Sequence, residues 1–394
     1  MTSKLNQKQT PAHSDLRHRQ ELPSGECRRI ALARYQPKGG LLPEWGELSP
    51  KFHNRDEKTL RNAVRRAFQE GLVKITEVPR PLRDFPRDSV AENAIREKFP
   101  VQAPIVVDTA PIIRSEFPTP EASESEAADD EVHRILGYAM AKTIAQGFVF
   151  DDDMVIGLGA GRGVFYTIEA LMAEHPLTPS NITVMSLTGA VQPSDYMRSL
   201  TLPLDADYLC WLLAKCFRSR VSLQQVWLPI THNDSSGTLL SAESWGKLHP
   251  GCILAGVGIL APGHRFYEAS QSVPDLLAPV AELRVLLKLC DELRTAAKST
   301  FSPVGDICHK LFYIQPPADL RIDRQKENQI RGAIDKVNER LLHISDSQLR
   351  DAKSIVLVAG TERKALAIRE LLKANVYKIR YLCTDKKTAA RLLQ

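Results

Sequence analysis

A glycine-rich segment near the middle of the chain has the composition of an anion-binding loop. In VIGLGAGRGVFYTIEAL, residues 155–171, four glycines alternate with other residues between an apolar run and a helical pattern: Gly157, Gly159, Gly161 and Gly163. A strand, a glycine turn and a helix direct free backbone N–H groups and the positive end of a helix dipole at one point. The segment predicts a site for a small anion, with Arg162 as a charged contact, and the alternative is a turn without a ligand.

Two nucleotide-binding patterns do not fit this loop. The dinucleotide pattern G-x-G-x-x-G fails because counting from Gly157 puts Arg162 in the third place, and counting from Gly159 puts Val164 there. The next predicted strand, ITVMSLTGA, offers no carboxylate for a ribose, and no Lys-Ser or Lys-Thr pair follows the glycines. A small phosphate or sugar phosphate remains as the predicted ligand, and no cofactor is expected.

Two further segments carry polar residues that could serve the same ligand. In SIVLVAGTERKALAIRELLKA, residues 354–374, Gly360 ends a strand, Thr361 can cap the following helix, and Lys364 falls in its first turn. A cation there opposes the helix dipole unless it shares an anion, although a lysine that points to solvent fits equally well. In SPVGDICHKLF, Asp306 lies in an otherwise apolar strand, where sugar hydroxyls or backbone donors would have to satisfy it.

The composition is that of an ordinary soluble globular protein. The chain has 394 residues, 43% of them hydrophobic and 25% charged, which is enough for two or three domains. No apolar run approaches the roughly 18 residues that span a bilayer, and the polar N-terminus is unlike a signal peptide, so we expect a cytoplasmic protein with no membrane partner. The seven cysteines form no C-x-x-C pair, which favours reduced buried thiols and predicts no metal site.

Positive charge is concentrated in the first quarter of the chain. Residues 1–100 hold 20 Lys and Arg against 13 Asp and Glu, a balance of +7, while the whole chain has a net charge of +5. A helix is predicted over 56–71, and its basic residues lie largely off the apolar stripe. Such a face fits nucleic-acid phosphates or solvent, and charge alone does not choose between them.

The distribution of apolar runs predicts four regions. Residues 1–25 are expected to be a disordered tail, residues 26–80 a small basic domain, and residues 81–131 a Pro-rich and acidic linker. An amphipathic helix opens the second domain, 132–394. There, strands are predicted at 154–159, 181–187, 225–230, 252–260, 354–360 and 378–384, and helices near 163–174, 204–217, 279–298, 325–342, 361–374 and 385–393. This alternation favours an α/β fold with a doubly wound, mostly parallel sheet.

Several of these motifs, in order, resemble the SorC family of bacterial sugar-responsive transcriptional regulators. The glycine loop, ITVMSLTGA, GVGILAPGHRFYEAS, SPVGDICHKLFY, SIVLVAGTERKALAIRELL and LCTDKKTAARLL are similar to successive family motifs over about 132–394. The resemblance implies an isomerase/CoA-transferase-like effector domain that binds a sugar or sugar phosphate without turning it over. The implied effector residues are Gly157, Gly159, Gly161, Arg162, Gly163, Thr188, Gly189, Asp306 and Lys364, with Gly163 where the family commonly has Thr.

The same family begins with a helix-turn-helix, to which DEKTLRNAVRRAFQEGLVKI, residues 56–75, is similar. By that resemblance 26–80 is a winged-helix-like DNA-binding domain, in which Lys58, Thr59 and Asn62 face bases and Arg61, Arg65 and Arg66 contact phosphates. Our leading hypothesis is a regulator, not an enzyme, that binds operator DNA as a homo-oligomer, dimer or tetramer, under control of its effector. The alternatives are a phospho-sugar isomerase or deaminase, with Asp306 as base and Lys364 as phosphate clamp, and an effector-binding protein that has lost DNA binding.

Overall fold

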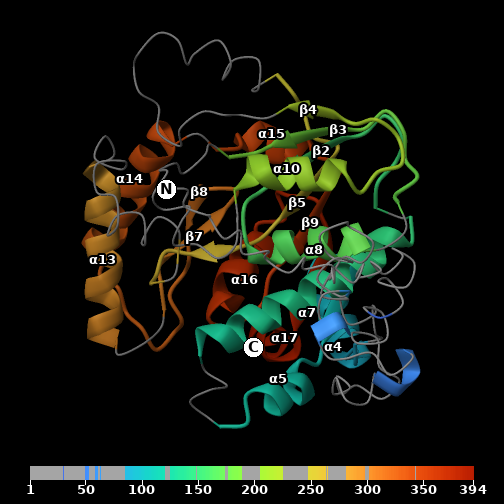
Figure 1. Cartoon of the computed structure of the whole chain (residues 1–394). Coiled ribbons are helices and arrows are strands. Elements are labelled where there is room, and N and C mark those ends of the chain that lie inside the picture. The colour runs from blue at the N-terminus through green and yellow to red at the C-terminus, as the bar shows by residue number, and fades with distance from the viewer. Residues whose placement is uncertain are drawn as a thin grey trace, which may run out of the picture. The chain divides into compact units, whose positions relative to one another are not determined.

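The computed structural model of the chain divides into two compact units, residues 1–78 and 79–394, which are described separately (Figure 1). The residues described are 30, 49–52, 58–60, 63, 85–119, 125–147, 149–173, 176–188, 205–224, 247–262, 264, 281–297, 301–341 and 343–394.

A seven-stranded sheet forms the centre of the second unit, and all of its strand pairs are parallel. Its order is β1-β10-β9-β5-β2-β3-β4. The strands are β1 (Ala103–Val107), β10 (Ile379–Asp385), β9 (Ser354–Val358), β5 (Cys252–Ala255), β2 (Val155–Leu158), β3 (Thr183–Ser186) and β4 (Ser222–Gln224). The central strands β5 and β9 are buried along their whole length. Continuous apolar strands of this kind belong to sheets that are covered on both faces, so the predicted doubly wound α/β fold is confirmed.

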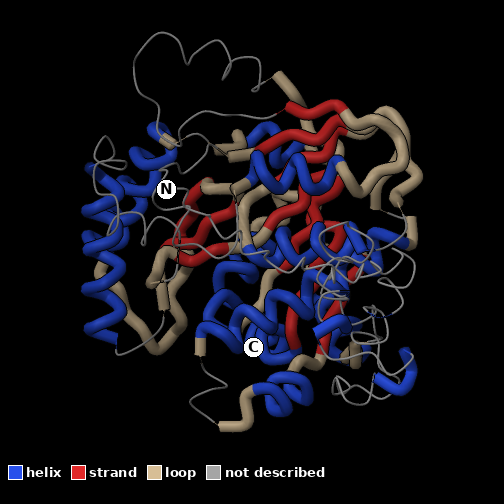
Figure 2. Tube along the Cα trace, in the orientation of Figure 1, coloured by secondary structure: helices blue, strands red, loops and turns tan. Residues whose placement is uncertain are grey.

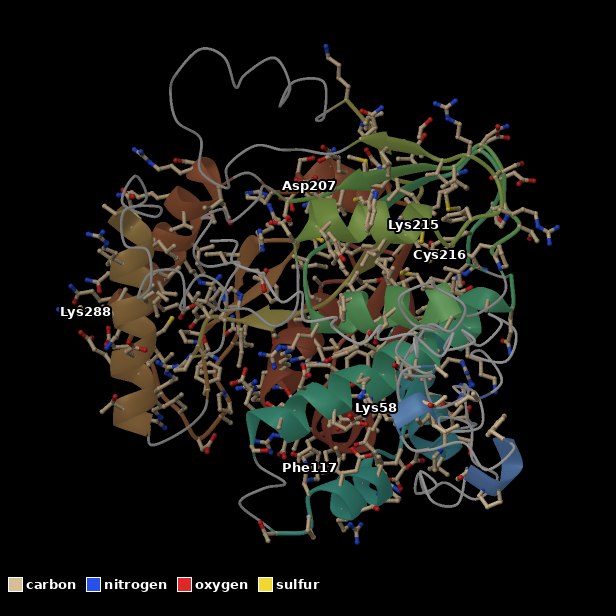
Figure 3. The ribbon with its side chains drawn as sticks, in the orientation of Figure 1. Lys58, Phe117, Asp207, Lys215, Cys216 and Lys288 are labelled. Carbon is tan, nitrogen blue, oxygen red and sulfur yellow. The ribbon has the colours of Figure 1, made fainter. Side chains whose placement is uncertain are left out.

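Helices cover both faces of this sheet, which Figure 2 shows as helical layers around the strands. Alternate residues of the central strands β5 and β9 enter two separate apolar clusters; in β9, Val356 and Val358 belong to one, and Ile355 and Leu357 to the other. The first cluster includes α7 (Glu126–Ala145), α8 (Arg162–Ala173) and α10 (Ala206–Ala214), with α5 (Ala110–Glu116) beside it. The second includes α4 (Ser89–Lys98), α15 (Asp346–Asp351), α16 (Ala365–Lys373) and α17 (Lys386–Leu393). Labels mark Asp207 and Lys215 near the two ends of α10 in Figure 3.

A second, antiparallel sheet of three strands follows β5 in the chain. It consists of β6 (Gly258–Ile259), β7 (Val304–Ile307) and β8 (Lys310–Tyr313), in that order. The helices α13 (Ala281–Ala297) and α14 (Arg324–Arg340) pack on it with a third apolar cluster (Figure 1). The predicted strand 252–260 is thus divided between two sheets, and the strand that carries Asp306 belongs to the smaller one. The predicted strand 225–230 lies outside the described residues.

The linker predicted over 81–131 is wrong for most of its length. Residues 89–98 form α4, and β1 pairs in register with β10 from Ala103 to Val107. Helix α7 begins at Glu126, where the side chain of Ser125 accepts a hydrogen bond from the N–H of Ala128. The physical reason is local: the five-residue run APIVV suffices for a buried strand, and a Ser cap followed by acidic residues favours a helix start. The composition of the whole segment, which is rich in Pro and Glu, obscures both the short strand and the helix start.

The described residues of the first unit fit a small helical core. Residues 49–52 form a short 3-10 helix that includes Pro50. Residues 58–60 and 63 are helical, as expected from the pattern at 56–71, and Leu60 and Ala63 are buried one helical turn apart. The helix-turn-helix itself remains a prediction, because most of its residues lie outside the described part of the chain.

Candidate functional site

Three loops come together at the carboxyl ends of the neighbouring strands β9, β5 and β2. The chain leaves β2 through α8 towards β3 on one side, whereas it leaves β5 towards β9 on the other side. All of the strands are parallel, but the order in which the chain adds them to the sheet reverses between β2 and β5. Ligands of open α/β sheets bind at such switch points. The loops touch here: a Cβ built on Gly256 would lie 3.7 Å from the Val358 carbonyl oxygen and 4.0 Å from that of Ala160.

The four glycines of the first loop have different physical roles. A Cβ on Gly157 would lie 2.8 Å from Leu187 side-chain atoms, one on Gly159 would lie 2.8 Å from Cys308 Sγ, and one on Gly163 would lie 2.7 Å from the Val358 carbonyl oxygen. These three positions therefore permit close packing of the core. Gly161 alone has a positive φ, +136°, and open space where a side chain would stand. Of the four, Gly161 is the glycine that leaves room for a ligand beside the start of α8.

Lys364 does not simply point to solvent. It caps α16 after the short 3-10 helix η2 (Glu362–Lys364), and its Nζ donates a hydrogen bond of 3.1 Å to Nε2 of His133 on α7. Burial lowers the pKa of Lys364 to about 8; Arg363 and Arg162 lower it too, while Asp129 and Asp306 raise it. Burial and the nearby cations also hold the pKa of His133 well below its usual value, so His133 is neutral and accepts this bond. A lysine with these neighbours gains from a bound anion.

Asp306 is buried in β7 and ionised. Its Oδ1 accepts a hydrogen bond from His264 Nε2 at 3.1 Å, and its Oδ2 accepts one from the backbone N–H of His309 at 3.1 Å. Burial raises the pKa of this carboxyl, but the hydrogen bond and charge of His264, together with His309, keep it below its ordinary value. The carboxylate covers Gly258, where any Cβ would overlap Oδ1. Cys308, two residues after Asp306, packs against Gly159 of the first loop, which brings the end of β7 to that loop.

Arg162, the predicted anion contact, is paired with carboxylates from the first two turns of α7. Its Nη2 contacts Glu126 Oε1, and its Nε lies 3.6 Å from Asp130 Oδ1. The hydroxyl of Tyr166 donates to the other oxygen of Asp130 at 2.5 Å. Asp129, on the same helix, pairs with Arg363 at 2.8 Å. Arg162 and Arg363, one cation from each loop, thus already face acidic groups, which an incoming anion would have to displace.

The remaining predicted effector residues are only partly described. Thr188 is fully buried in an isolated bridge with His343, and its hydroxyl has no hydrogen-bond partner among the described residues. Thr361 Oγ1 likewise has no hydrogen-bond partner among the described residues. The predicted capping of the following helix by the Thr361 side chain is therefore not observed. Gly189 lies outside the described part of the chain. The hydroxyls of Thr188 and Thr361 thus keep unused hydrogen-bonding capacity within the described part of the chain.

Little of the predicted DNA-binding surface can be placed. Lys58, labelled in Figure 3, is exposed, and Thr59 is partly buried. Arg61, Asn62, Arg65 and Arg66 lie outside the described residues. An exposed Lys58 on a helix whose Leu60 is buried is compatible with phosphate contact and with a solvated face alike.

The sequence alone did not identify His133, His264 or the acidic residues of α7 as parts of the site. His133 and His264 carry no motif of their own, and only the packing of α7 and the small sheet brings them to Lys364 and Asp306. The acidic residues lie within the predicted linker, although the sequence contains a pattern that could have identified them. Ser125 followed by Glu126 and Asp129 is typical of a helix N-terminus.

The chemistry of the described residues is that of a polar binding site. Six cysteines are free and buried, and burial raises the pKa of the Cys308 thiol, which therefore stays protonated at neutral pH. Among the described residues, no group of three or more His, Cys, Asp or Glu could hold a metal ion. In that same part of the chain, no helix combines the length and apolar character that a membrane span needs.

Comparison with known families gives one match. Residues 329–394 match the family described as "Putative sugar-binding domain". The matched segment includes β9, Thr361, Lys364 and Asp385, but not the glycine loop or Asp306. No curated protein matches the chain in sequence.

Solved structures of transcriptional regulators are similar to the chain. The full-length sorbitol operon regulator SorC from Klebsiella pneumoniae is 17% identical, with a TM-score of 0.49, and the similarity covers 94% of this chain and 99% of that one. A probable sor operon regulator from Shigella flexneri is 16% identical, with a TM-score of 0.48 and coverage of 78% and 99%. A DeoR family regulator from Listeria monocytogenes is 16% identical, with a TM-score of 0.48 and coverage of 77% and 98%. The resemblance predicted from the sequence thus reappears in these comparisons.

Proposed function

We propose that this chain is a bacterial transcriptional regulator whose second unit binds a sugar or sugar phosphate as an effector. The observation that carries this proposal is the meeting of the loops after β2, β5 and β9 at the switch point of a parallel sheet, with the open Gly161 turn in one loop and Lys364 in another. Asp306 lies two residues before Cys308, which packs against Gly159 of the first loop. A buried carboxylate can accept hydrogen bonds from sugar hydroxyls, and a lysine beside a helix N-terminus can bind an anionic group. The sugar-binding family match over 329–394 supports the same ligand class.

In this proposal the basic first quarter of the chain binds operator DNA, and the effector shifts the population between assemblies that bind DNA and assemblies that do not. The effector need not react, so the site requires no nucleophile, and the protonated Cys308 thiol supplies none. Because operators with paired half-sites demand two-fold partners, the acting form is a symmetric dimer or tetramer in the cytoplasm.

The test is a DNA-binding assay with the full-length protein and the DNA upstream of its own gene, with and without a panel of free and phosphorylated sugars. We expect a shift that weakens steeply with salt and that responds to at least one sugar. An Arg65→Ala, Arg66→Ala variant should weaken binding to all DNA sequences alike. Sugar binding without any DNA shift would instead indicate an effector-binding protein that has lost DNA recognition.

One observation favours an enzyme as the second candidate. The ionised Asp306 is hydrogen-bonded to His264, and it lies within electrostatic reach of Lys364, whose pKa is about 8. Perturbed groups of this kind cluster in catalytic sites as well as in binding sites. A phospho-sugar isomerase or deaminase would turn over a sugar phosphate and lose that activity in an Asp306→Asn variant. Turnover in the absence of any DNA binding would replace the regulator proposal.

A further inference from the structure

The acidic start of α7 faces the cations that an anionic effector would use. Glu126 contacts Arg162 at the start of α8, and Asp129 contacts Arg363 in the loop after β9 at 2.8 Å. These two ion pairs connect α7 to both ligand-facing loops. Gly137 of α7 packs directly against Tyr166 of α8, and a Cβ on Gly137 would lie only 2.6 Å from the Cβ of Tyr166. This close contact fixes where the two helices cross. The pairs therefore form in a region whose backbone is closely packed.

The carboxylates of this turn differ in how firmly they are held. Asp130 accepts a hydrogen bond of 2.5 Å from Tyr166, which is itself buried. The Glu126 side chain is 72% exposed and that of Asp129 30% exposed, and they form ion pairs with Arg162 and Arg363, respectively. Exposed ion pairs contribute little to folding stability, so releasing Glu126 and Asp129 costs little. They are the pair that a ligand could displace.

The charges of the cluster nearly cancel without a ligand. Arg162, Arg363 and Lys364 carry positive charge, and the three acidic residues of α7, Glu126, Asp129 and Asp130, carry negative charge beside them. A phosphate that entered without displacing these acids would meet repulsion as well as attraction. An uncharged sugar, in contrast, can hydrogen-bond to Asp306 and to the open loop without disturbing any of these pairs.

Two buried groups show that the cluster has unused hydrogen-bonding capacity. The side chains of Thr361 and His133 are more than nine-tenths buried, and Thr361 Oγ1 and His133 Nδ1 have no hydrogen-bond partner among the described residues. Both residues adjoin the cations: Thr361 precedes Arg363 in its loop, and His133 contacts Lys364. Buried polar atoms normally have partners, so a ligand oxygen between the two loops would satisfy them.

We propose that Glu126 and Asp129 are specificity-determining residues of the effector site, which lower its affinity for anionic ligands by competing for Arg162 and Arg363. This inference rests on the proposed function for the location of the site. It adds the chemistry of selection: the ligand must either carry an anionic group that binds better than these carboxylates or carry none. Binding of such an anion also frees the first turn of α7, the segment that follows residues 120–124 in the chain.

The experiment compares three full-length proteins: the unaltered chain, a Glu126→Gln, Asp129→Asn variant, and an Asp335→Asn, Glu339→Gln control. The control removes two exposed carboxylates from α14, on the smaller sheet, and so matches the change in net charge. Inorganic phosphate is titrated by calorimetry at constant ionic strength with chloride as the balancing salt. We expect the α7 variant to bind phosphate roughly tenfold more tightly than the unaltered chain and the control.

The gain must depend on the freed cation. Adding Arg162→Gln to the α7 variant should remove most of the increase, whereas the same change in the control background should have a smaller effect. Equal or weaker phosphate binding by the α7 variant would overturn the proposal, because the carboxylates would then be neutral or would position the cations. Absence of phosphate binding by all three proteins would overturn it too.

The result is separable from that of the proposed function. If uncharged sugars bind and release DNA while the α7 variant gains no phosphate affinity, this inference fails and the regulator proposal stands. If the phosphate affinity rises as expected but no sugar alters DNA binding, the competition is real and the regulator proposal fails.

Discussion

The loops that follow β2 and β9 have the same design, a strand that ends in a glycine turn and leads into a helix with a cation near its start. They differ in the state of that cation. Arg162 in the first loop is paired with Glu126 and Asp130, partly in solvent. Lys364 in the second loop is partly buried, with neutral His133 as its hydrogen-bond partner.

The comparison shows that equal motifs do not make equal contacts. Arg162 loses an existing ion pair when it binds an anion, so its net contribution is small. Lys364 is already partly desolvated on folding, and its hydrogen-bond partner His133 is neutral, so an anion adds to the limited countercharge that Asp129 and Asp306 supply. We therefore expect Lys364 to contribute most of the affinity for an anionic group and Arg162 to adjust it.

The largest expected effect separates the two cations directly. Lys364→Met should weaken phosphate binding by about 10- to 100-fold, because a hydrogen bond to a charged group contributes about 1.5–3 kcal/mol. Arg162→Gln should weaken it by less than about fivefold, since an exposed pair contributes roughly 0–1 kcal/mol. Calorimetric titration of both variants measures the difference. Equal losses would show that the two loops bind the anion alike, and the contrast drawn here would be wrong.

The lowered pKa of Lys364 gives the second effect, a loss of anion affinity as the pH rises. Only the protonated lysine binds the anion, and with a pKa of about 8 most of it is charged at pH 7 and little of it at pH 9. Sulfate affinity should therefore fall about tenfold between these pH values. Sulfate is the probe because its own charge is constant in this range.

A Lys364→Arg variant is the control for this pH effect. Arginine stays charged at both pH values, so its sulfate affinity should be nearly flat. A fall that persists in this variant would assign the titration to another group. His133 is not that group, since its pKa lies below its usual value and it is neutral throughout.

The sequence predicted five of the seven strands of the large sheet and the two loops, because these depend on local patterns, but it missed β1 and β4. Runs such as SIVLV are apolar over their whole length, and a glycine after each run indicates where the strand ends. The same patterns placed Arg162 and Lys364 at helix starts, although they did not distinguish a cation paired with carboxylates from one with a neutral partner.

What the sequence could not supply depends on contacts between distant segments. The partner of Lys364 is 231 positions away along the chain, and Asp306 meets His264 only because β6 and β7 pair in the small sheet. Gly163, which in the sequence marks a missing hydroxyl, is instead the point where α8 approaches the Val358 carbonyl oxygen. The composition predicts a linker where α7 begins, because the helix-capping residues there are few among many charged ones.

The smallest expected effect concerns the backbone of the two turns. Gly161 has a φ of +136° with open space around it, whereas the corresponding turn after β9 places Thr361 at a φ of +73°. A β-branched residue at positive φ is strained by roughly 1–3 kcal/mol. Thr361→Gly should relieve this strain, and this gain is partly offset by the greater freedom of glycine in the unfolded chain. The free energy of unfolding should therefore rise by about 1 kcal/mol.

Gly161→Ala should lower the free energy of unfolding by about as much, because alanine cannot easily adopt that φ although nothing blocks its methyl group. Chemical denaturation followed by circular dichroism measures both changes. If Thr361→Gly lowers the stability instead, the buried Thr361 side chain contributes more than its strain costs, because glycine retains the N–H that donates to Asp385 at 2.8 Å. The turn after β9 would then be the rigid wall of the site, and the turn after β2 the adaptable one.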